Sequence, residues 1–365
     1  MRILYKFGYL SAFLLPLIAV LSWYGGWAYN YLTAAFVFLF ITLIDYFVGL
    51  DTRNIPKEKT DEVSHEMYYR FITYSWVFVQ IAFVVWGCFV IGATPHLPLY
   101  SRIGFVLGFS LITGGIGITV AHELGHKKSA LERLYSKLLL MTVCYMHFYI
   151  EHNRGHHVTV ATPEDPATAR KHENFYSFWI RSVFHGYAHA WKLERDRLNR
   201  QGKSVWNFDN AMFAYTLLPI LFGVSLMLGI SWWFDRTCWD VLIFFFAQSI
   251  GAFTLLELVN YIEHYGIVRR KLSNGQYERV NPLHSWNASH LVSNFFLFQL
   301  QRHSDHHANA IKRYQVLDHF DESPQLPFGY PTMILIALLP PLWFRIMNPK
   351  LEEWERKNYS PALAA

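Results

Sequence analysis

Half of the 18 histidines in the sequence fall into four short segments. The first segment, AHELGHKK at residues 121–128, contains H-E-x-x-H, which on a helix is a zinc-protease signature. The other three are EHNRGHH, NYIEHYG and QRHSDHH. Residues i, i+3 and i+4 share one face of a helix, so neighbouring imidazoles in a segment can point at one position. The candidate metal ligands are His122, His126, His152, His156, His157, His264, His303, His306 and His307.

A single pair of histidines is more often a solvated surface pair than a metal site. His185 and His189 form such an i, i+4 pair, and we interpret them as surface residues. Four histidine groups, each with the spacing of metal ligands, are poorly explained as chance surface pairs and favour a metal site. The other histidines lack the pattern: His65, His96, His147, His172, His284, His290 and His319.

Nine imidazoles exceed the four ligands of a tetrahedral zinc ion, so two metal ions with four to five nitrogens each are expected. Imidazole suits iron, zinc, copper and nickel. The three cysteines, Cys88, Cys144 and Cys238, form no C-x-x-C pair, which argues against an iron–sulfur cluster. Two redox ions close together suggest oxygen activation. We therefore predict two histidine-ligated iron ions with O2 as co-substrate.

An acidic residue adjoins every histidine group. Sequence neighbours on a helix point about 100° apart, so an acid is not expected to bind the same ion as the adjacent histidine. Accepting the N–H of a ligand imidazole is the expected role, because such acceptors fix the tautomer and orientation of the ring. We also expect the loop 161–170 to hold an aspartate near the metals. The predicted supporting acids are Glu123, Glu151, Glu263, Asp305 and Asp165.

The chain has 365 residues, of which 53% are hydrophobic and only 16% are charged. A soluble domain carries about 25% charged residues, so this composition indicates an integral membrane protein. The net charge of +5 comes without a dense Lys/Arg tract, which argues against nucleic acid as a partner. Six apolar blocks are long enough to span a bilayer, and we predict spans at about 7–24, 27–50, 70–93, 101–123, 211–234 and 239–262.

Lysine and arginine placement orients these spans. Basic residues lie at the N-terminus and in segments 51–69, 124–210 and 263–328. The connections on the opposite side, residues 25–26, 94–100 and 235–238, contain a single lysine or arginine, Arg236. Both termini and the histidine segments are therefore predicted to be cytoplasmic. His122 and His264 lie at the cytoplasmic ends of the fourth and sixth spans, so all nine histidines can meet just beneath the bilayer.

The expected fold is an all-α membrane protein with six transmembrane helices and a cytoplasmic helical cap that carries the dimetal site. Residues 1–350 form one domain, and residues 351–365 are a polar tail or linker. The apolar stretches 138–150 and 330–346 are expected to be interfacial or re-entrant helices, because the first is short and paired prolines break the second. The aromatic and basic segment 172–199 is expected to lie against the membrane surface.

The fourth span is a candidate wall of a substrate channel because it is rich in glycine and leads directly to His122. Missing side chains at Gly115 and Gly117 leave room for an apolar substrate, although close helix packing explains glycines equally well. Glu257 lies inside the sixth span, where a carboxylate is costly, and Asn260 shares its helix face with His264. We expect both residues to line the route to the metals, with pairing to another span as the alternative for Glu257.

The protease interpretation requires His122, His126 and a third ligand on one zinc ion, with Glu123 as base. It leaves the other seven histidines without a role. The segments HELGHKK, EHNRGHHVTVATPEDPATAR, NYIEHYG and LQRHSDHHA instead resemble the histidine motifs of the integral-membrane alkane 1-monooxygenases, and HSWNASHLVSN is similar to that family as well. The resemblance covers about residues 30–345. Fatty-acid desaturases and hydroxylases share a looser version with eight histidines.

The resemblance implies a diiron centre ligated by these nine histidines, without bridging carboxylates. It implies O2-dependent terminal hydroxylation of medium-chain n-alkanes to 1-alkanols in the inner membrane of a bacterium. It also implies a rubredoxin as electron donor, with an NADH-dependent rubredoxin reductase. Because residues 1–365 contain no paired C-x-x-C motifs, the electron carrier is expected outside them. A membrane fatty-acyl desaturase or hydroxylase is the main alternative, ahead of a metal transporter and a zinc protease.

Overall fold

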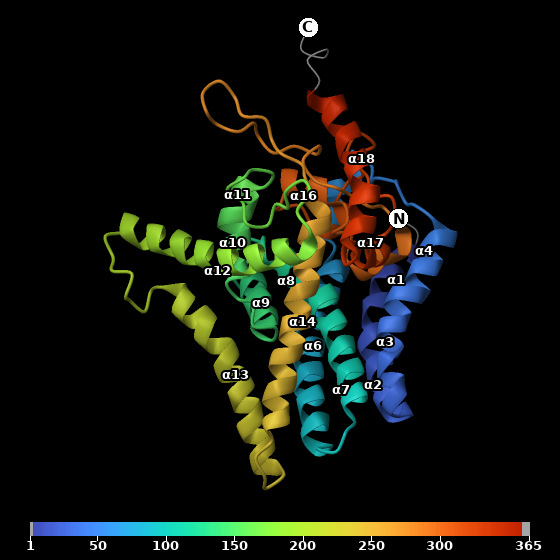
Figure 1. Ribbon diagram of the computed structural model, residues 1–365, viewed down its shortest axis with the longest axis vertical. Coiled ribbons are helices and arrows are strands. Elements are labelled where there is room, and N and C mark those ends of the chain that lie inside the picture. Colours follow the sequence, from blue (N-terminus) through green and yellow to red (C-terminus); the bar gives the residue numbers. More distant parts are fainter. Residues whose placement is uncertain (1–2, 360–365) are drawn as a thin grey trace.

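The computed structural model describes residues 3–359, and every regular element within them is a helix (Figure 1). In this part of the chain, extended backbone pairs only at isolated bridges, which join Leu50 to His290, Lys271 to Tyr277 and Asn287 to Gln325. The prediction of an all-α fold is confirmed.

Six helices are long and apolar enough to cross a membrane, as predicted. The fourth span is the most deeply buried of them and the second is the most exposed. Exposed aromatic side chains such as Phe47, Phe71 and Trp232 cover the outer faces of these helices, as expected where the solvent is lipid. The spans are Tyr5–Gly25, Trp27–Val48, Met67–Ala93, Leu99–Gly125, Ala211–Trp233 and Trp239–Glu263.

Three spans are single helices and three are built from consecutive shorter elements. Within the composite spans, η3 and η4 are π-helical, with an extra residue per turn that widens the helix. The elements are α1 (Ile3–Gly8), η1 (Tyr9–Phe13) and α2 (Leu14–Gly25); η2 (Trp27–Tyr31), α3 (Leu32–Ala35), η3 (Phe36–Ile41) and α4 (Thr42–Val48); α6 (Met67–Ala93); α7 (Leu99–Ser110), η4 (Leu111–Ile118) and α8 (Thr119–Gly125); α13 (Ala211–Trp233); and α14 (Trp239–Glu263).

The long helix α12 and several short helices form a cap over one end of the spans (Figure 1). The start of α1 and the end of α18 lie at this same end, as an even number of crossings requires. Helix α12 runs across the span direction, in the way expected for a helix on a membrane surface. The cap consists of α5 (Lys57–His65), α9 (Ala130–Met141), α10 (Phe148–Glu151), η5 (His152–His156), α11 (His157–Thr159), α12 (Phe175–Arg200), α15 (Leu291–Phe296), α16 (His303–Ala308) and η6 (Tyr314–Val316).

Two helices near the C-terminus, α17 (Tyr330–Ala337) and α18 (Pro340–Tyr359), meet at a bend of 119°. This bend agrees with the broken, re-entrant geometry expected for residues 330–346. The polar tail expected from residue 351 differs from the structure, because residues 351–359 continue α18. Leu351 and Trp354 are buried there, and this packing holds the helix against the body. Residues 360–365 lie outside the described residues.

Polar side chains join the inner spans to one another. Gln248 on α14 accepts a hydrogen bond of 2.9 Å from the Thr113 hydroxyl on η4 and donates one of 2.9 Å to the Thr142 carbonyl. Gln80 on α6 donates to the Thr142 hydroxyl at 2.8 Å. Such bonds replace the hydrophobic driving force that helices lack in lipid. They fix α6, η4 and α14 around the site described below.

Glycines let η4 and α14 approach closely. A Cβ atom at Gly114 would lie 2.5 Å from the Ala252 carbonyl oxygen, which cannot move without displacing the helix. Gly104 and Gly108 pack against Tyr31 and Thr33 of the second span in the same manner. Close packing is therefore one real function of the glycines in the fourth span.

We expect Gly114→Ala to lower the free energy of unfolding by about 1–3 kcal/mol, the usual effect of overpacking. Gly229→Ala on α13 is the control, since an added Cβ there would meet no neighbouring side chain or helix within 4 Å and alanine is the better helix former. The measurement is the midpoint of thermal unfolding in detergent. Equal midpoints for the two variants would contradict the packing role of Gly114.

Candidate metal centre

Nine histidine side chains from four separate segments converge at the end of the spans that the cap covers. They come from α8 and the residue that ends it, from η5 and α11, from the end of α14, and from α16. They form two groups, in each of which the ligand nitrogens all lie within 4.8 Å of one another. The five-histidine group is His122, His126, His152, His157 and His306, and the four-histidine group is His156, His264, His303 and His307.

The Nε2 atoms of the five-histidine group form a chain of short contacts. His126 Nε2 lies 3.3 Å from His122 Nε2 and 3.1 Å from His152 Nε2. His157 Nε2 lies 3.0 Å from His152 Nε2 and 3.2 Å from His306 Nε2. Five imidazoles therefore aim the same ring nitrogen at one small volume.

The four-histidine group has the same construction. His303 Nε2 lies 3.1 Å from His264 Nε2 and 2.9 Å from His307 Nε2, and His156 Nε2 lies 3.3 Å from His307 Nε2. The two groups are adjacent, since the rings of His157 and His307 have centroids 4.6 Å apart. The two groups thus form one continuous centre.

The geometry and protonation of these residues fit metal ions. Nitrogens bound at about 2.0–2.1 Å to one ion lie about 3 Å apart, which matches the contacts above. Burial lowers the pKa of His157 to about 3 and that of His152 well below its usual value. These imidazoles are therefore neutral, as metal binding requires. Two metal ions, one per group, are what this donor set accommodates.

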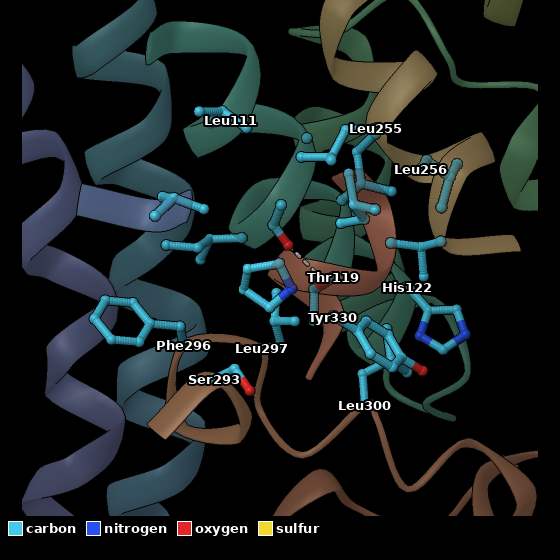
Figure 2. Close-up of a pocket in the computed structure, with 18 of the residues that line it drawn as sticks. Leu111, Thr119, His122, Leu255, Leu256, Ser293, Phe296, Leu297, Leu300 and Tyr330 are labelled. Carbon is cyan, nitrogen blue, oxygen red and sulfur yellow. Dashed lines mark hydrogen bonds between the residues drawn. The ribbon is translucent and has the colours of Figure 1, made fainter. Parts of the chain in front are cut away.

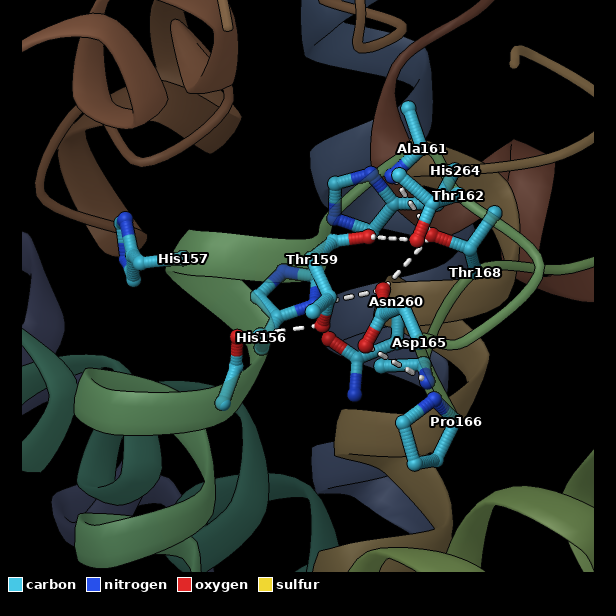
Figure 3. Close-up of polar contacts among 12 residues, drawn as sticks. His156, His157, Thr159, Ala161, Thr162, Asp165, Pro166, Thr168, Asn260 and His264 are labelled. Carbon is cyan, nitrogen blue, oxygen red and sulfur yellow. Dashed lines mark hydrogen bonds and ion pairs between the residues drawn. The ribbon is translucent and has the colours of Figure 1, made fainter. Parts of the chain in front are cut away.

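A π-helical turn decides which histidines of EHNRGHH act together. The sequence spacing suggested that His152 and His156 share one face, as i and i+4 do on an α-helix. In the structure residues 152–156 form the π-helix η5, so His152 instead shares its group with His157 at i+5. His156 points the other way, and Figure 3 shows His157 directed away from His156 and Asp165.

Helix α16 divides its histidines in the ordinary α-helical way. His303 and His307, at i and i+4, both belong to the four-histidine group. His306 lies one residue before His307 and belongs to the five-histidine group. This short helix therefore bridges the two groups, which the sequence spacing alone did not indicate.

Asp165 supports a histidine of the centre. Its Oδ2 atom lies 2.9 Å from His156 Nδ1 and accepts a hydrogen bond of 2.6 Å from the Thr168 hydroxyl (Figure 3). Burial opposes a charge on His156, yet the Asp165 carboxylate raises the pKa of this imidazole. An acceptor at Nδ1 leaves the Nε2 lone pair free for a metal. The loop 161–170 thus brings Asp165 to the centre, as expected.

Within residues 3–359, three of the other acids form no hydrogen bond or ion pair with the nine histidines, contrary to expectation. Glu123 forms an ion pair of 2.9 Å with Lys127, and Asp305 forms one of 2.6 Å with Lys312. Glu151 Oε1 lies 3.3 Å from Nδ1 of His189, which the sequence analysis interpreted as a surface residue and which is half-buried in the structure. Glu123 and Asp305 are thus paired with lysines instead of with ligand imidazoles. The protease interpretation loses its base in the same way, because Lys127 holds Glu123.

Glu263 does meet a histidine of the centre, but on the metal side. Its Oε2 atom lies 3.2 Å from His303 Nε2, and its Oε1 atom accepts a hydrogen bond of 2.5 Å from the Tyr330 hydroxyl. An orienting acceptor would sit at Nδ1 instead. In the described part of the chain the Nδ1 atoms of His122, His264, His303 and His307 have no hydrogen-bond partner. Packing, rather than acids, therefore orients these four rings.

An apolar cavity leads to the centre. Figure 2 shows leucine and phenylalanine side chains around it, with His122 and Tyr330 among the few polar groups. The cavity touches both histidine groups, through His122 and His152 of one and His303 of the other. Its apolar lining comes mainly from residues Val37, Phe38, Ile41, Leu111, Leu255, Leu256, Val259, Phe296, Leu297, Leu300 and Ile334.

Of the four residues expected to line a channel, two line the cavity in the structure and two do not. Gly115 and Asn260 line the cavity. A Cβ atom at Gly117 would clash with the side-chain amide of Gln80, so this glycine serves helix packing. Glu257 accepts a hydrogen bond of 2.8 Å from the Tyr145 hydroxyl and lines a smaller neighbouring cavity. Its cost in the sixth span is offset by this hydrogen bond from the cap, rather than by pairing with another span as the alternative interpretation held.

Comparisons with known proteins agree with this site. A sequence model of the fatty acid desaturase family matches residues 95–337, which contain all nine histidines. Alkane 1-monooxygenase 2 of Pseudomonas aeruginosa strain PAO1 is 44% identical over 331 residues, which cover 90% of this chain and 85% of the relative. This chain belongs to the alkane 1-monooxygenase family. Another alkane 1-monooxygenase 2, from Alcanivorax borkumensis strain SK2, is 39% identical over 96% of this chain and 91% of the relative.

The chain is also similar to a more distant protein, the xylene/toluene monooxygenase hydroxylase component of Pseudomonas putida. It is 30% identical over 263 residues, which cover 71% of this chain and 67% of the relative. Together with the six apolar helices, membership of the family identifies the chain as a multi-pass membrane protein.

We expect Asp165→Ala to weaken metal binding by the four-histidine group about 10–100-fold, the usual effect of losing a hydrogen-bond partner of a ligand. The control is Glu164→Ala, because Glu164 is the exposed neighbour of Asp165. Metal content after competition with a chelator measures the effect. Identical retention of metal by both variants would show that Asp165 does not support the site.

Proposed function

We propose that the protein is an O2-dependent alkane monooxygenase that converts medium-chain n-alkanes to 1-alkanols. One observation carries this proposal: an apolar cavity ends at two adjacent groups of histidines whose ligand nitrogens converge. The names of the relatives, alkane 1-monooxygenases at 38–44% identity, support the same substrate class.

We propose that each histidine group holds one iron ion, with five ligands on one ion and four on the other. Iron in this position supplies the activation of O2, which the side chains cannot perform. Affinity for nitrogen ligands does not favour Fe(II) over zinc or copper, so the choice of iron rests on the redox reaction. The side chains hold the ions, bind the alkane and exclude water.

Shape selects the terminal carbon of the alkane. An alkane has no polar group, so hydrogen bonds cannot distinguish one of its carbons from another. The cavity walls are apolar, and the histidines of the centre lie where the cavity reaches His122 and His303. A chain that enters end-on brings its terminal carbon to that position. Apolar walls also keep water from the reacting carbon.

We propose that the cap faces the cytoplasm at the inner membrane of a bacterium, since the segments rich in lysine and arginine lie on that side. Alkanes partition into the bilayer, so substrate reaches the cavity between the spans. Electrons come from the aqueous side, and a reduced rubredoxin with its NADH-dependent reductase is the donor we propose.

A membrane fatty-acyl desaturase or hydroxylase is the second candidate, because the family model that matches the chain is that of the desaturases. The purified protein, supplied with NADH, rubredoxin, reductase and O2, is the direct test. Formation of 1-octanol from octane supports the proposal. Modification of an acyl lipid without octanol formation would favour the second candidate.

We expect His264→Ala to lower bound iron and to abolish hydroxylation while the protein stays in the membrane, because the four-histidine group loses one of its donors. His185→Ala on α12 is the control, since this histidine is exposed and lies outside both groups. Iron per chain and octanol formation are measured together. Full activity of His264→Ala would exclude a ligand role for this residue.

We expect Gly115→Leu to shift the chain-length preference towards shorter alkanes. Position 115 lines the cavity, and its nearest atom, Leu255 Cδ2, would lie 3.5 Å from an added Cβ. Each CH2 group that no longer fits forgoes about 0.8 kcal/mol, so the loss of two changes relative kcat/KM about tenfold. The ratio of octane to dodecane turnover measures the shift, with Gly229→Leu as control. An unchanged ratio would show that the side chain at position 115 does not limit the space available to the alkane.

A further inference from the structure

Asp45 is a buried carboxylate near the end of the second span. It belongs to α4 and is 3% exposed. Its Oδ1 atom accepts two backbone hydrogen bonds, at 3.0 Å from the Val292 N–H and at 3.1 Å from the Ser293 N–H. A carboxylate inside an apolar span is costly, so a residue of this kind usually has a specific role.

The two N–H groups belong to the first turn of α15. The first N–H groups of a helix have no acceptor within the helix and are usually capped by a side chain just before it. His290 precedes α15, and its side chain makes no capping hydrogen bond. Asp45 takes that place from a different helix. Because α15 has only six residues, it depends on such contacts for its stability and its direction.

Backbone hydrogen bonds join the same two segments next to this contact. The Leu291 N–H donates to the Gly49 carbonyl at 3.2 Å, and the Asp51 N–H donates to the Ser289 carbonyl at 2.7 Å. These bonds hold the chain just before α15 beside the end of the second span. Asp45 adds the contact that fixes the first turn of the helix itself.

The elements that Asp45 joins are walls of the apolar cavity. Ile41, one turn before Asp45, lines it, and so do Ser293 and Phe296 of α15. Figure 2 shows the Ser293 and Phe296 side chains on the same side of the cavity. Asp45 itself does not line the cavity. It therefore acts on the shape of the cavity through α15.

A third wall segment lies against the same carboxylate. A Cβ atom at Gly329 would lie 3.0 Å from Asp45 Oδ2 and 3.3 Å from His290 Cγ. The two residues after Gly329, Tyr330 and Pro331, begin α17 and line the cavity. The second span, α15 and the start of α17 thus meet at Asp45, without room for further side-chain atoms.

We propose that Asp45 is a positioning residue for the alkane, since it fixes α15 against the second span and thereby fixes one wall of the cavity. This inference rests on the proposed function. An alkane offers no polar group, so the shape of the walls alone places it. A displaced α15 moves Ser293 and Phe296 and changes which carbon of the alkane faces the histidines.

The test uses the whole protein in detergent, loaded with iron and supplied with octane. Asp45→Ala should raise the share of 2-octanol in the product about tenfold, because a displacement of about 1 Å can change a reaction rate about a hundredfold. Hydrogen exchange at the Val292 and Ser293 amides should become about tenfold faster, as expected when a hydrogen bond to a charged acceptor is lost. Asp45→Asn retains an acceptor and should restore most of the product ratio.

The control is Asp61→Ala, since Asp61 lies on the cap helix α5 and is exposed. Its product ratio and its exchange at Val292 and Ser293 should match the wild type. Unchanged exchange in Asp45→Ala would overturn the proposal. Faster exchange with an unchanged product ratio would overturn it as well, because Asp45 would then hold α15 without placing the alkane.

Gly329→Ala decides the question if Asp45→Ala does not fold. The backbone at Gly329, with φ −64° and ψ 160°, suits alanine, and the added Cβ would displace the Asp45 carboxylate. The share of 2-octanol and the exchange at Ser293 should both rise, whereas Gly229→Ala should change neither. No rise in either quantity would overturn the proposal. Failure of the proposed function would instead appear as a wild-type protein that forms no octanol.

Discussion

The structure depends on nine imidazoles whose Nε2 atoms converge, at separations of about 3 Å, on two points in a buried site. Burial lowers the pKa of rings in the cap such as His152 and His307 and keeps them neutral, so lone pairs face one another across each group. Such a set is favourable only around cations. The fold must therefore bring four segments that are far apart in the sequence to the same depth. The fourth span, through its last element α8, and the sixth span, α14, supply rigid ends for this purpose. The cap elements η5 and α16 supply histidines to both groups, together with His157 of α11.

Departures from ideal α-helical geometry lie next to the centre. The π-helix η5 rotates His156 away from His152 and so divides one motif between two metal positions. The π-helix η4 widens the fourth span beside the cavity, where Gly115 lines the wall and Gly114 lets α14 approach. π-helical turns are often found at functional sites because they redirect side chains without ending the helix. Here they redirect a ligand and open space for a substrate.

The role of an acid near the centre depends on which nitrogen of the imidazole ring it contacts. Asp165 meets His156 at Nδ1 and orients it, whereas Glu263 meets His303 at Nε2, on the side of the metal. Glu123 and Asp305 are adjacent to histidines in sequence yet pair with Lys127 and Lys312. Adjacency in sequence places a side chain on a different face of a helix, so it predicts proximity to the centre but not contact with it.

The sequence by itself determined the six spans, because about 20 consecutive apolar residues have no favourable environment except a bilayer. It also identified the nine histidines, since their spacing and their place at the ends of the fourth and sixth spans are local properties. Only the tertiary structure decided how the nine divide, because that depends on a π-helical turn in η5 and on where α14 ends. It also decided that Asn260 and Gly115 line the cavity while Glu257 and Gly117 do not. Those outcomes depend on contacts with Tyr145 and Gln80, distant in sequence, and no local pattern encodes such contacts.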